Sequence, residues 1–299
     1  MKHFKGLLSA ILLVTAIGFV ACKPSTGTDN NGGGSGGSGG SSGGSSTRQE
    51  VSGKIGKYGS PYEVGDIVFN DGSAMPYTDF AALDTATKNA KKTSAIALIF
   101  YKGTGLNSGN DTTTSRTLGV GLKHNQTGLA WCLSSANACY KDITTIQCLA
   151  GSRSFTGDKN GSDNLEQIEA FEGVDDTATA EKYPAFYFGK NYKEQKIGSE
   201  TASRIAADSE FVTGWYLPSI AELFQIYACR EDIRNGFDID AASEALDGDK
   251  FGTSLYWSSS QNDSSVTSAS AYLLSFDDGD WTNDSKYSEY YVCCIRAFN

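Results

Sequence analysis

GWYLPSIAELFQIY, residues 214–227, is the clearest helix pattern in the chain. Ser219 is suited to cap this helix, and Glu222, three residues later, completes a capping box. One apolar stripe then follows on a single face of the helix, formed by Ile220, Leu223, Phe224 and Tyr227. The pattern predicts a helix over 219–230 that packs under the strands that follow it.

Strand patterns lie on both sides of this helix. VGDIVF (64–69) alternates and runs into an Asn-Asp-Gly turn, which predicts an early hairpin. AIALIFY (95–101) is a continuous apolar run typical of a buried strand. Three more elements are expected: a helix at 79–92 and strands at 272–276 and 290–298. Short strands and long loops with few helices predict an α+β fold.

Four motifs follow one another in the last third of the chain: GWYLPSIAELFQIY (214–227), YWSSS (256–260), AYLLSFDDGDW (271–281) and YVCCIRAF (291–298). In this order they resemble the C-terminal domain family of the Legionella collagen-like adhesin, whose frame reads G-W-R-L-P-T, E-L, Y-W-S-S, F-x-x-G and Y-V-x-x-V-R. The resemblance covers about 85 residues, 214–298. Tyr216 stands where the family usually has Arg, so a role of that Arg does not carry over.

The chain begins with an export signal. Two lysines form a basic n-region, and the apolar run 7–20 is too short to span a membrane comfortably. A small residue before Cys22 resembles a bacterial lipobox, with Phe19 in place of the usual Leu. We therefore expect 1–21 to be a lipoprotein signal peptide and Cys22 to carry the lipid that anchors an exported protein, at the outer membrane surface. The alternative is an ordinary secretory signal peptide, followed by a Cys22 that carries no lipid.

Residues 22–50 form a tether after the signal. The run NNGGGSGGSGGSSGGSSTRQ (30–49) offers no apolar face, so burial cannot offset the entropy lost on ordering. Such a segment reaches about 25–30 Å from the membrane. No second low-complexity break follows it, so we expect 51–299 to be one ligand-binding domain.

The lipobox, the Gly/Ser tether and the VGDIVF opening together resemble treponemal surface lipoproteins, including treponemal variable protein A. That resemblance implies a C-type-lectin-like fold, of the formylglycine-generating-enzyme type, as a single domain with short strands and long loops. It also implies that a diversity-generating retroelement varies the last segment of the chain.

WSSSQNDSSVTSASAYLLSF (257–276) alternates framework residues with short polar ones. All nine residues of 262–270 belong to the set that adenine mutagenesis of Asn codons produces, as the resemblance implies. The alternative is that Ser, Asn and Asp dominate ordinary surface loops. The expected framework is Trp257, Tyr272, Leu274, Phe276, Gly279, Ile295 and Arg296. The expected ligand-binding residues are Asn262, Asp263, Ser265, Thr267, Ser270, Asp278, Asp280, Thr282, Asn283, Asp284, Tyr287 and Tyr290.

Six cysteines remain after Cys22, an even number that suggests disulfides in an exported chain. Six cysteines allow fifteen pairings. The expected pairings are Cys132 with Cys148 and Cys229 with Cys293, which leaves Cys139 and Cys294 either free or paired. No C-x-x-C pattern occurs, so a structural zinc site is not expected.

Residues 158–169, DKNGSDNLEQIE, come closest to a metal motif. Asp158, Asn160, Ser162 and Glu169 have the spacing of a calcium-binding EF-hand loop, together with Asn164 and Glu166. Asp163, however, occupies the position that needs glycine, and no helix precedes the segment. The alternative is that Asp163 caps a short helix with Glu166 as its partner. Calcium is thus a weak candidate, and no other cofactor is expected.

One histidine, His124, remains in the mature chain, and LKHNQTG (122–128) predicts a solvated loop around it. The formal charge is −10, or about −12 once the two lysines of the signal are removed, which argues against nucleic acid as a partner. Membrane contact is expected through the lipid only. Two functions remain: a surface protein that binds an unknown extracellular protein or glycan, and a lectin-fold enzyme related to formylglycine-generating enzymes. We favour binding over catalysis, because no matching catalytic cysteine arrangement is found.

Overall fold

The computed structural model describes residues 48–108, 111–151, 154–172, 181–194, 196–197, 200–201, 204–230, 237–262 and 269–299. The expected signal peptide, Cys22 and most of the tether therefore lie outside the described residues. Within these ranges, no helix combines the length and apolarity needed to cross a membrane.

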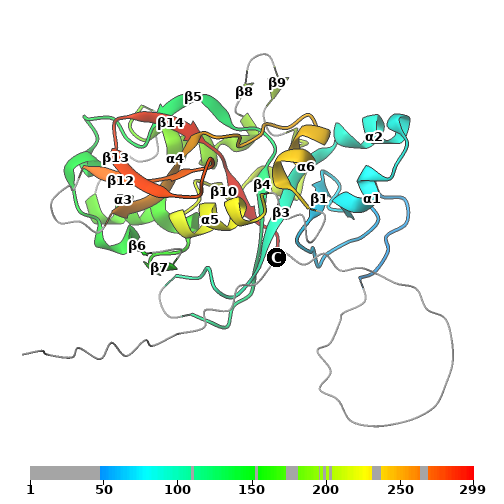
Figure 1. Cartoon of the computed structure of the whole chain (residues 1–299), viewed down its shortest axis with the longest axis horizontal. Helices are drawn as coiled ribbons and strands as arrows, with labels where there is room; N and C mark the ends of the chain where they lie inside the picture. The colour runs from blue at the N-terminus through cyan, green and yellow to red at the C-terminus, as the bar shows by residue number, and fades with distance from the viewer. Residues whose placement is uncertain are drawn as a thin grey trace, which may run out of the picture.

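The first sheet has six antiparallel strands in the order β10-β15-β4-β3-β1-β2. Their bounds are Asp66–Phe69 (β1), Ala74–Pro76 (β2), Ala95–Gly103 (β3), Arg116–Gly121 (β4), Trp215–Tyr216 (β10) and Ile295–Ala297 (β15). The predicted early hairpin is confirmed as β1–β2, with Ile67 opposite Met75, and the predicted buried strand as β3. Strands from both ends of the domain thus share one sheet (Figure 1).

The second sheet has seven strands, in the order β13-β12-β11-β14-β5, with β6 on β11 and β7 on β6. Their bounds are Asn125–Ala130 (β5), Gln147–Gly151 (β6), Ser154–Gly157 (β7), Leu255–Asn262 (β11), Ser270–Ser275 (β12), Trp281–Ser285 (β13) and Glu289–Val292 (β14). The expected last strand at 290–298 is in fact two strands: β14 belongs to this sheet and β15 to the first. The chain crosses between the sheets at Cys293 and Cys294. A small ladder joins Lys196–Ile197 (β8) and Glu200–Thr201 (β9).

The helices pack around and between these sheets. They are Tyr77–Ala81 (α1), Thr85–Lys92 (α2), Asn164–Glu172 (α3), Pro184–Lys190 (α4), Ile220–Ala228 (α5) and Ile239–Ala245 (α6), with 3-10 turns at Asn137–Tyr140 (η1), Thr144–Ile146 (η2), Gly161–Asp163 (η3), Tyr192–Glu194 (η4) and Glu210–Val212 (η5). The single helix expected at 79–92 is two helices, because Asp84 caps the start of α2 by accepting a hydrogen bond from the Thr87 N–H. The α+β prediction is confirmed.

Helix α5 links the two sheets, since it contacts β3 of the first and β11 and β12 of the second. Its predicted capping box is confirmed: Ser219 Oγ accepts from the Glu222 N–H, and Glu222 Oε2 accepts from the Ser219 N–H at 2.8 Å. Apolar residues of α5 such as Leu223 are buried with Tyr272 and Phe276 in one core cluster.

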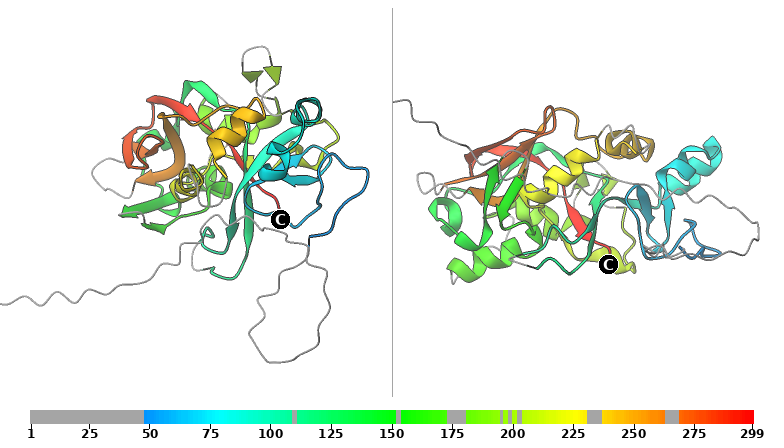
Figure 2. Two further views of the ribbon diagram at one scale, coloured as in Figure 1. Left: turned by 45° about the vertical axis from the view of Figure 1, so that its right-hand side comes forward. Right: turned by 60° about the horizontal axis from the view of Figure 1, so that its bottom comes forward.

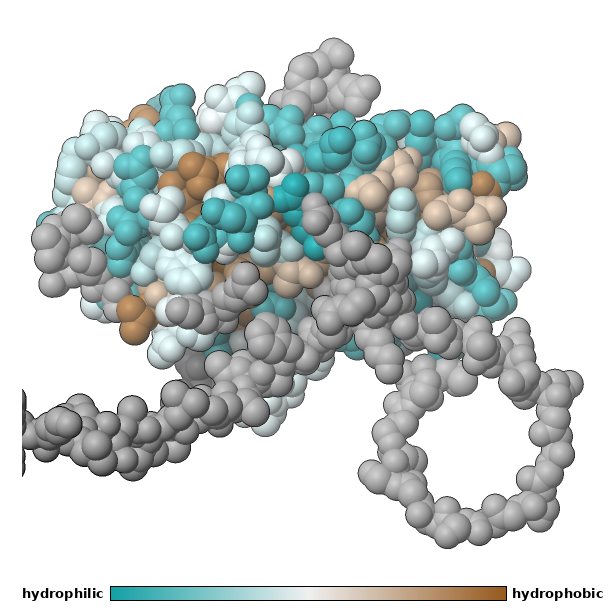
Figure 3. All heavy atoms as spheres, in the orientation of Figure 1, coloured by the Kyte–Doolittle hydropathy of each residue, from teal (hydrophilic) through white to brown (hydrophobic). Residues whose placement is uncertain are grey.

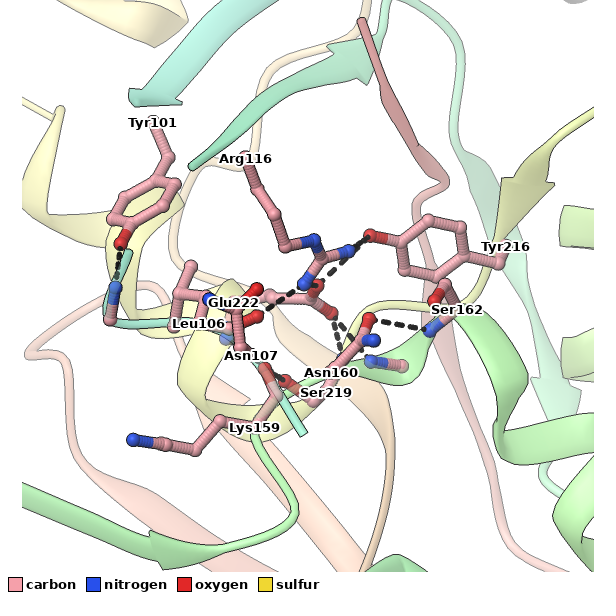
Figure 4. A network of polar contacts seen from close by, with 12 residues as sticks. Tyr101, Leu106, Asn107, Arg116, Lys159, Asn160, Ser162, Tyr216, Ser219 and Glu222 are labelled. Atoms are coloured by element: carbon pink, nitrogen blue, oxygen red, sulfur yellow. Dashed lines mark hydrogen bonds and ion pairs between the residues drawn. The ribbon is translucent and has the colours of Figure 1, made fainter. Parts of the chain in front are cut away.

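The Glu222 carboxylate also lies at the centre of a buried polar network (Figure 4). Arg116 Nη1 donates to its Oε1 at 3.0 Å, and the Tyr216 hydroxyl donates to the same oxygen at 2.9 Å. The Gly161 N–H donates to Oε2 at 3.0 Å, which fixes the turn before α3. Burial raises the pKa of Glu222, while Arg116 opposes that shift. Arg116, which supplies the guanidinium of this network, belongs to β4 and also donates to the Tyr216 hydroxyl.

His124 is buried rather than solvated, so the sequence-based expectation for it is wrong. Only 1% of the residue is exposed, and its Nδ1 lies 2.9 Å from the Tyr256 hydroxyl oxygen. The ring centroid is 4.4 Å from that of Phe251. Burial, with the Asp249 charge opposing it, lowers the pKa of His124 to about 4. The imidazole is therefore a neutral core group at neutral pH.

The two tentative disulfides are also wrong. Cys293 is a thiol, so it does not pair with Cys229, and the pairing of Cys132 with Cys148 is absent as well. Cys132 and Cys148 belong to different core clusters, which explains why they do not meet. Cys139 and Cys294, the two cysteines outside these expected pairings, are both buried thiols.

Candidate functional site

The C-terminal candidates lie on β12, β13 and the loop that follows, at one end of the molecule. Figures 1 and 2 show these strands opposite helices α1 and α2 in every view. β13 is an edge strand, and β12 pairs with it from Ser270 opposite Ser285 to Leu274 opposite Trp281. The framework residues of β12 are buried, whereas Thr282 and Asn283 on β13 are exposed. We call the exposed surface of residues 277–290 the C-terminal face.

The turn between β12 and β13 is held against helix α5. Asp277, Asp278 and Asp280 are exposed, but Gly279 between them is buried with a positive φ of 77°. A Cβ at this glycine would lie 2.3 Å from the Tyr227 ring of α5, so only glycine fits. Asp278 Oδ1 accepts from the Asp280 N–H at 3.1 Å, and this bond lowers the pKa of Asp278. The acidic side chains are therefore presented from a rigid turn.

A second fixed point joins β13 to β14. The Tyr290 hydroxyl donates to Asp284 Oδ2 at 2.6 Å. This hydrogen bond is the main reason why the pKa of Tyr290 rises to about 12 and that of Asp284 falls. The Tyr290 ring meets the buried ring of Trp257 edge-on at 5.2 Å. Asp284 and Tyr290 are both half-buried, so they support the C-terminal face as well as contribute to its surface.

Lys286 is a third fixed point, and sequence reasoning missed it. Its side chain is fully buried, and Nζ donates to the carbonyl oxygens of Ala138 at 2.8 Å and Lys141 at 3.1 Å. The ammonium also lies 4.9 Å from the centre of the Trp131 ring, a favourable cation–π distance. The next residue, Tyr287, is 49% exposed. The buried lysine therefore anchors the loop that presents Tyr287.

Tyr140 of η1 extends the face beyond the predicted segment. It is 55% exposed, and Lys286 Nζ donates to the carbonyl oxygens of Ala138 and Lys141 on either side of it in sequence, which brings this turn close to the loop that presents Tyr287. Leu133, three residues after the end of β5, is also exposed. The Cys132 N–H beside it donates to the Lys286 carbonyl, which links this segment to the same loop. No sequence signal connects these residues to 262–290.

The remaining ligand candidates are less accessible. The sequence predicts Asn262 and Ser270 at the exposed face, but the structure buries both, with 8% and 5% exposed. Asn262 is covered because β6 pairs with β11 there, opposite Cys148, and its Oδ1 accepts from the Tyr272 hydroxyl at 3.2 Å. Three candidates lie outside the described residues: Asp263, Ser265 and Thr267.

The EF-hand-like residues shape the start of a helix. Asp158 Oδ1 accepts from the Asn160 N–H at 3.1 Å, and Asn160 Oδ1 accepts from the Ser162 N–H at 3.1 Å. Asn160, rather than Asp163, therefore caps the turn that leads into α3. Across the described ranges, no group of three or more His, Cys, Asp or Glu side chains is placed to hold a metal ion. Asp158 and Asn160 therefore help to start the helix, as the alternative to calcium binding expected of this segment, but with Asn160 and not Asp163 as the cap.

Two adjacent buried cysteines, Cys293 and Cys294, are poorly suited to nucleophilic chemistry. Burial raises the pKa of Cys293 and Cys294 well above the usual thiol value. The thiolate is the reactive form, and reactive cysteines occupy electropositive, partly exposed sites that lower the pKa. Comparison with known proteins adds no assignment: no protein-family model and no curated protein matches the chain.

Proposed function

We propose that this chain is a lipid-anchored bacterial surface protein that binds an external protein or glycan through its C-terminal face. The α+β architecture with short strands and long connections supports a C-type-lectin-like fold for the binding domain. The export signal, the lipid on Cys22 and retroelement diversification belong to the same proposal and rest on the sequence motifs.

The observation that carries this proposal is the way the C-terminal face is built. Exposed short polar side chains and Tyr287 project from a segment held at three points: Gly279 against α5, Tyr290 on Asp284, and buried Lys286. Binding sites are commonly loops held by a rigid scaffold, and Tyr beside Ser, Asn and Asp gives adaptable contacts at low entropic cost. The face can therefore accept sequence changes without repacking the core.

The hydrophilic character of the surface also fits a ligand-binding function. In Figure 3 hydrophilic residues dominate the face shown, and apolar residues appear in small separate groups. A ligand at the C-terminal face would therefore be held by hydrogen bonds and aromatic contacts rather than by one large apolar patch. The high thiol pKa of Cys293 and Cys294 also favours a binding function over a cysteine-dependent enzyme.

A matched pair of triple variants tests the proposal. Asp278→Ala, Thr282→Ala and Asn283→Ala remove three exposed side chains from the C-terminal face. A control with the same residue types, Asp79→Ala, Thr85→Ala and Asn89→Ala, alters exposed positions on and beside α1 and α2 at the opposite end (Figure 2).

The wild-type chain and both variants are applied to a glycan array and to an array of extracellular matrix proteins. We expect the wild type and the control to bind the same targets and the face variant to lose them while its melting temperature stays unchanged. Equal binding by all three proteins, or binding by none, would refute the proposed function.

A further inference from the structure

A cavity of about 620 Å³ lies between the β6–β7 hairpin, η2 and the segment that leads from η3 into α3. This volume is within the range of about 300–1,000 Å³ that is usual for small-molecule sites. None of its lining residues belongs to 262–290, so the cavity is separate from the C-terminal face. It is nevertheless adjacent to the same sheet, because β6 pairs with β11.

The lining is rich in groups that both donate and accept hydrogen bonds. Four hydroxyl side chains contribute, with Thr156 among them, and two carboxamides, Gln147 and Gln167. Asp158 and Asp163 add carboxyl groups, and Lys159 adds a positive charge among the lining residues that the structure describes. Phe155 provides an aromatic ring in the lining. An apolar ligand would leave these polar groups without partners, which is costly.

Asp158 is held in place from behind the cavity wall. It is only 8% exposed, and its Oδ2 accepts from Asn164 Nδ2 at 2.8 Å. The same amide nitrogen donates to Ser259 Oγ of β11 at 2.8 Å, and the Asp158 N–H donates to the Gln147 carbonyl at 3.0 Å. The carboxyl group is therefore oriented before any ligand arrives, which lowers the entropy cost of binding.

Phe155 is fixed as firmly as Asp158. Its ring centroid lies 5.4 Å from that of Phe224 on α5 and 6.1 Å from that of Trp281 on β13. The cavity thus combines one oriented carboxyl, several hydroxyl and amide groups and one immobilised ring.

We propose that this cavity binds a neutral saccharide unit. Adjacent hydroxyl groups of a sugar each donate and accept, which matches carboxyl, carboxamide and hydroxyl side chains, and the C–H face of a sugar ring suits the Phe155 ring. The described lining residues carry two carboxyl groups and one lysine, so they offer no net positive charge to attract an anion. A saccharide is therefore the ligand class that satisfies both the polar lining and the ring.

Thr156→Trp tests the site, because Thr156 is an exposed β7 position in the cavity wall where an indole would occupy the space. Thr127→Trp is the control, an exposed strand position on β5 that does not line the cavity. Gln167→Ala is a second cavity variant that deletes a polar group without filling the space. The probes are free glucose, galactose, mannose, N-acetylglucosamine and their common disaccharides, and the readout on the full-length chain is saturation-transfer NMR followed by titration.

We expect at least one of these sugars to bind the wild type and Thr127→Trp equally. Thr156→Trp should abolish binding, and Gln167→Ala should weaken it about tenfold, as expected when one hydrogen-bonding group is removed. The triple variant of the C-terminal face should bind the sugar normally, which separates this site from the proposed function. The inference is overturned if no probe sugar binds the wild type, or if binding survives Thr156→Trp.

Discussion

The Asp158→Asn substitution should stabilise the protein at neutral and alkaline pH. Burial is the main reason why the pKa of Asp158 rises from 3.8 to about 7, against the opposing hydrogen bonds from Asn164 and Asn160. The introduced carboxamide keeps an acceptor for the Asn160 N–H. Its amide nitrogen replaces Oδ2, which in the wild type accepts from Asn164 Nδ2 at 2.8 Å, so a hydrogen bond remains there only if the Asn164 amide turns over and presents Oδ1 to the new donor. The substitution therefore removes a disfavoured charge and, with that rotation, keeps a hydrogen bond between the two side chains.

The magnitude follows from the shift in pKa. A raised folded-state pKa means that the unfolded chain releases this proton first, so wild-type stability falls as pH rises from about 4 to about 7 and is then constant. One pKa unit corresponds to about 1.36 kcal/mol, so a shift from 3.8 to about 7 amounts to about 4 kcal/mol. The variant has no titrating group here, and its stability advantage should grow by about 4 kcal/mol between pH 4 and pH 8.

Urea denaturation at pH 4, 5, 6, 7 and 8, followed by tryptophan fluorescence, measures this advantage directly. His124 and the other titrating groups are present in both proteins, so they cancel in the difference. Asp163→Asn is the control, since it removes a carboxylate five residues away at a half-buried position. An advantage that does not change with pH, or one that Asp163→Asn reproduces, would refute the assignment of the shift to burial of Asp158.

Three further predictions concern the anchor, the domain and the framework. Palmitate labelling should mark the wild-type chain and not Cys22→Ser, and equal labelling of both would contradict lipidation. Limited proteolysis should remove residues up to about 50 and then stop, whereas a stable intermediate cut near 150–180 would favour two domains. Phe276→Ala should cost roughly 3–5 kcal/mol of unfolding free energy because the ring is fully buried, while Asn283→Ala should stay within about ±0.5 kcal/mol. Similar losses in the two proteins would contradict the division into framework and exposed face.

Local signals predicted several elements correctly. The capping box of α5 depends on Ser219 and Glu222, which are three residues apart, and the β1–β2 hairpin depends on one short turn. These patterns act over a few residues, so the sequence alone displays them. The same holds for the exposure of Asp278 and Asp280, which follow directly from a Gly-containing turn.

Errors arose where distant residues decide the outcome. His124 looks like a loop residue until Tyr256, 132 positions later, supplies a partner for its ring. The final strand looks continuous, but its two halves belong to different sheets, and only the neighbours of each half determine that. The disulfide pairings failed for a related reason, since an even cysteine count carries no information on which thiols meet in space.

The candidate site includes features that local sequence predicts and features that depend on distant residues. The apolar residues of β12 are buried and Thr282 and Asn283 of β13 are exposed, as predicted, but Ser270 of β12 was predicted to be exposed and is buried. The pattern also cannot reveal Lys286, whose partner carbonyls at Ala138 and Lys141 lie about 145 residues earlier. A lone lysine in a polar stretch normally indicates solvent exposure, because burial of an ammonium is costly unless it is paired. Here the carbonyls of η1 and the Trp131 ring provide that pairing. The loop that presents Tyr287 and the turn that carries Tyr140 are therefore joined by a contact that no single stretch of sequence contains.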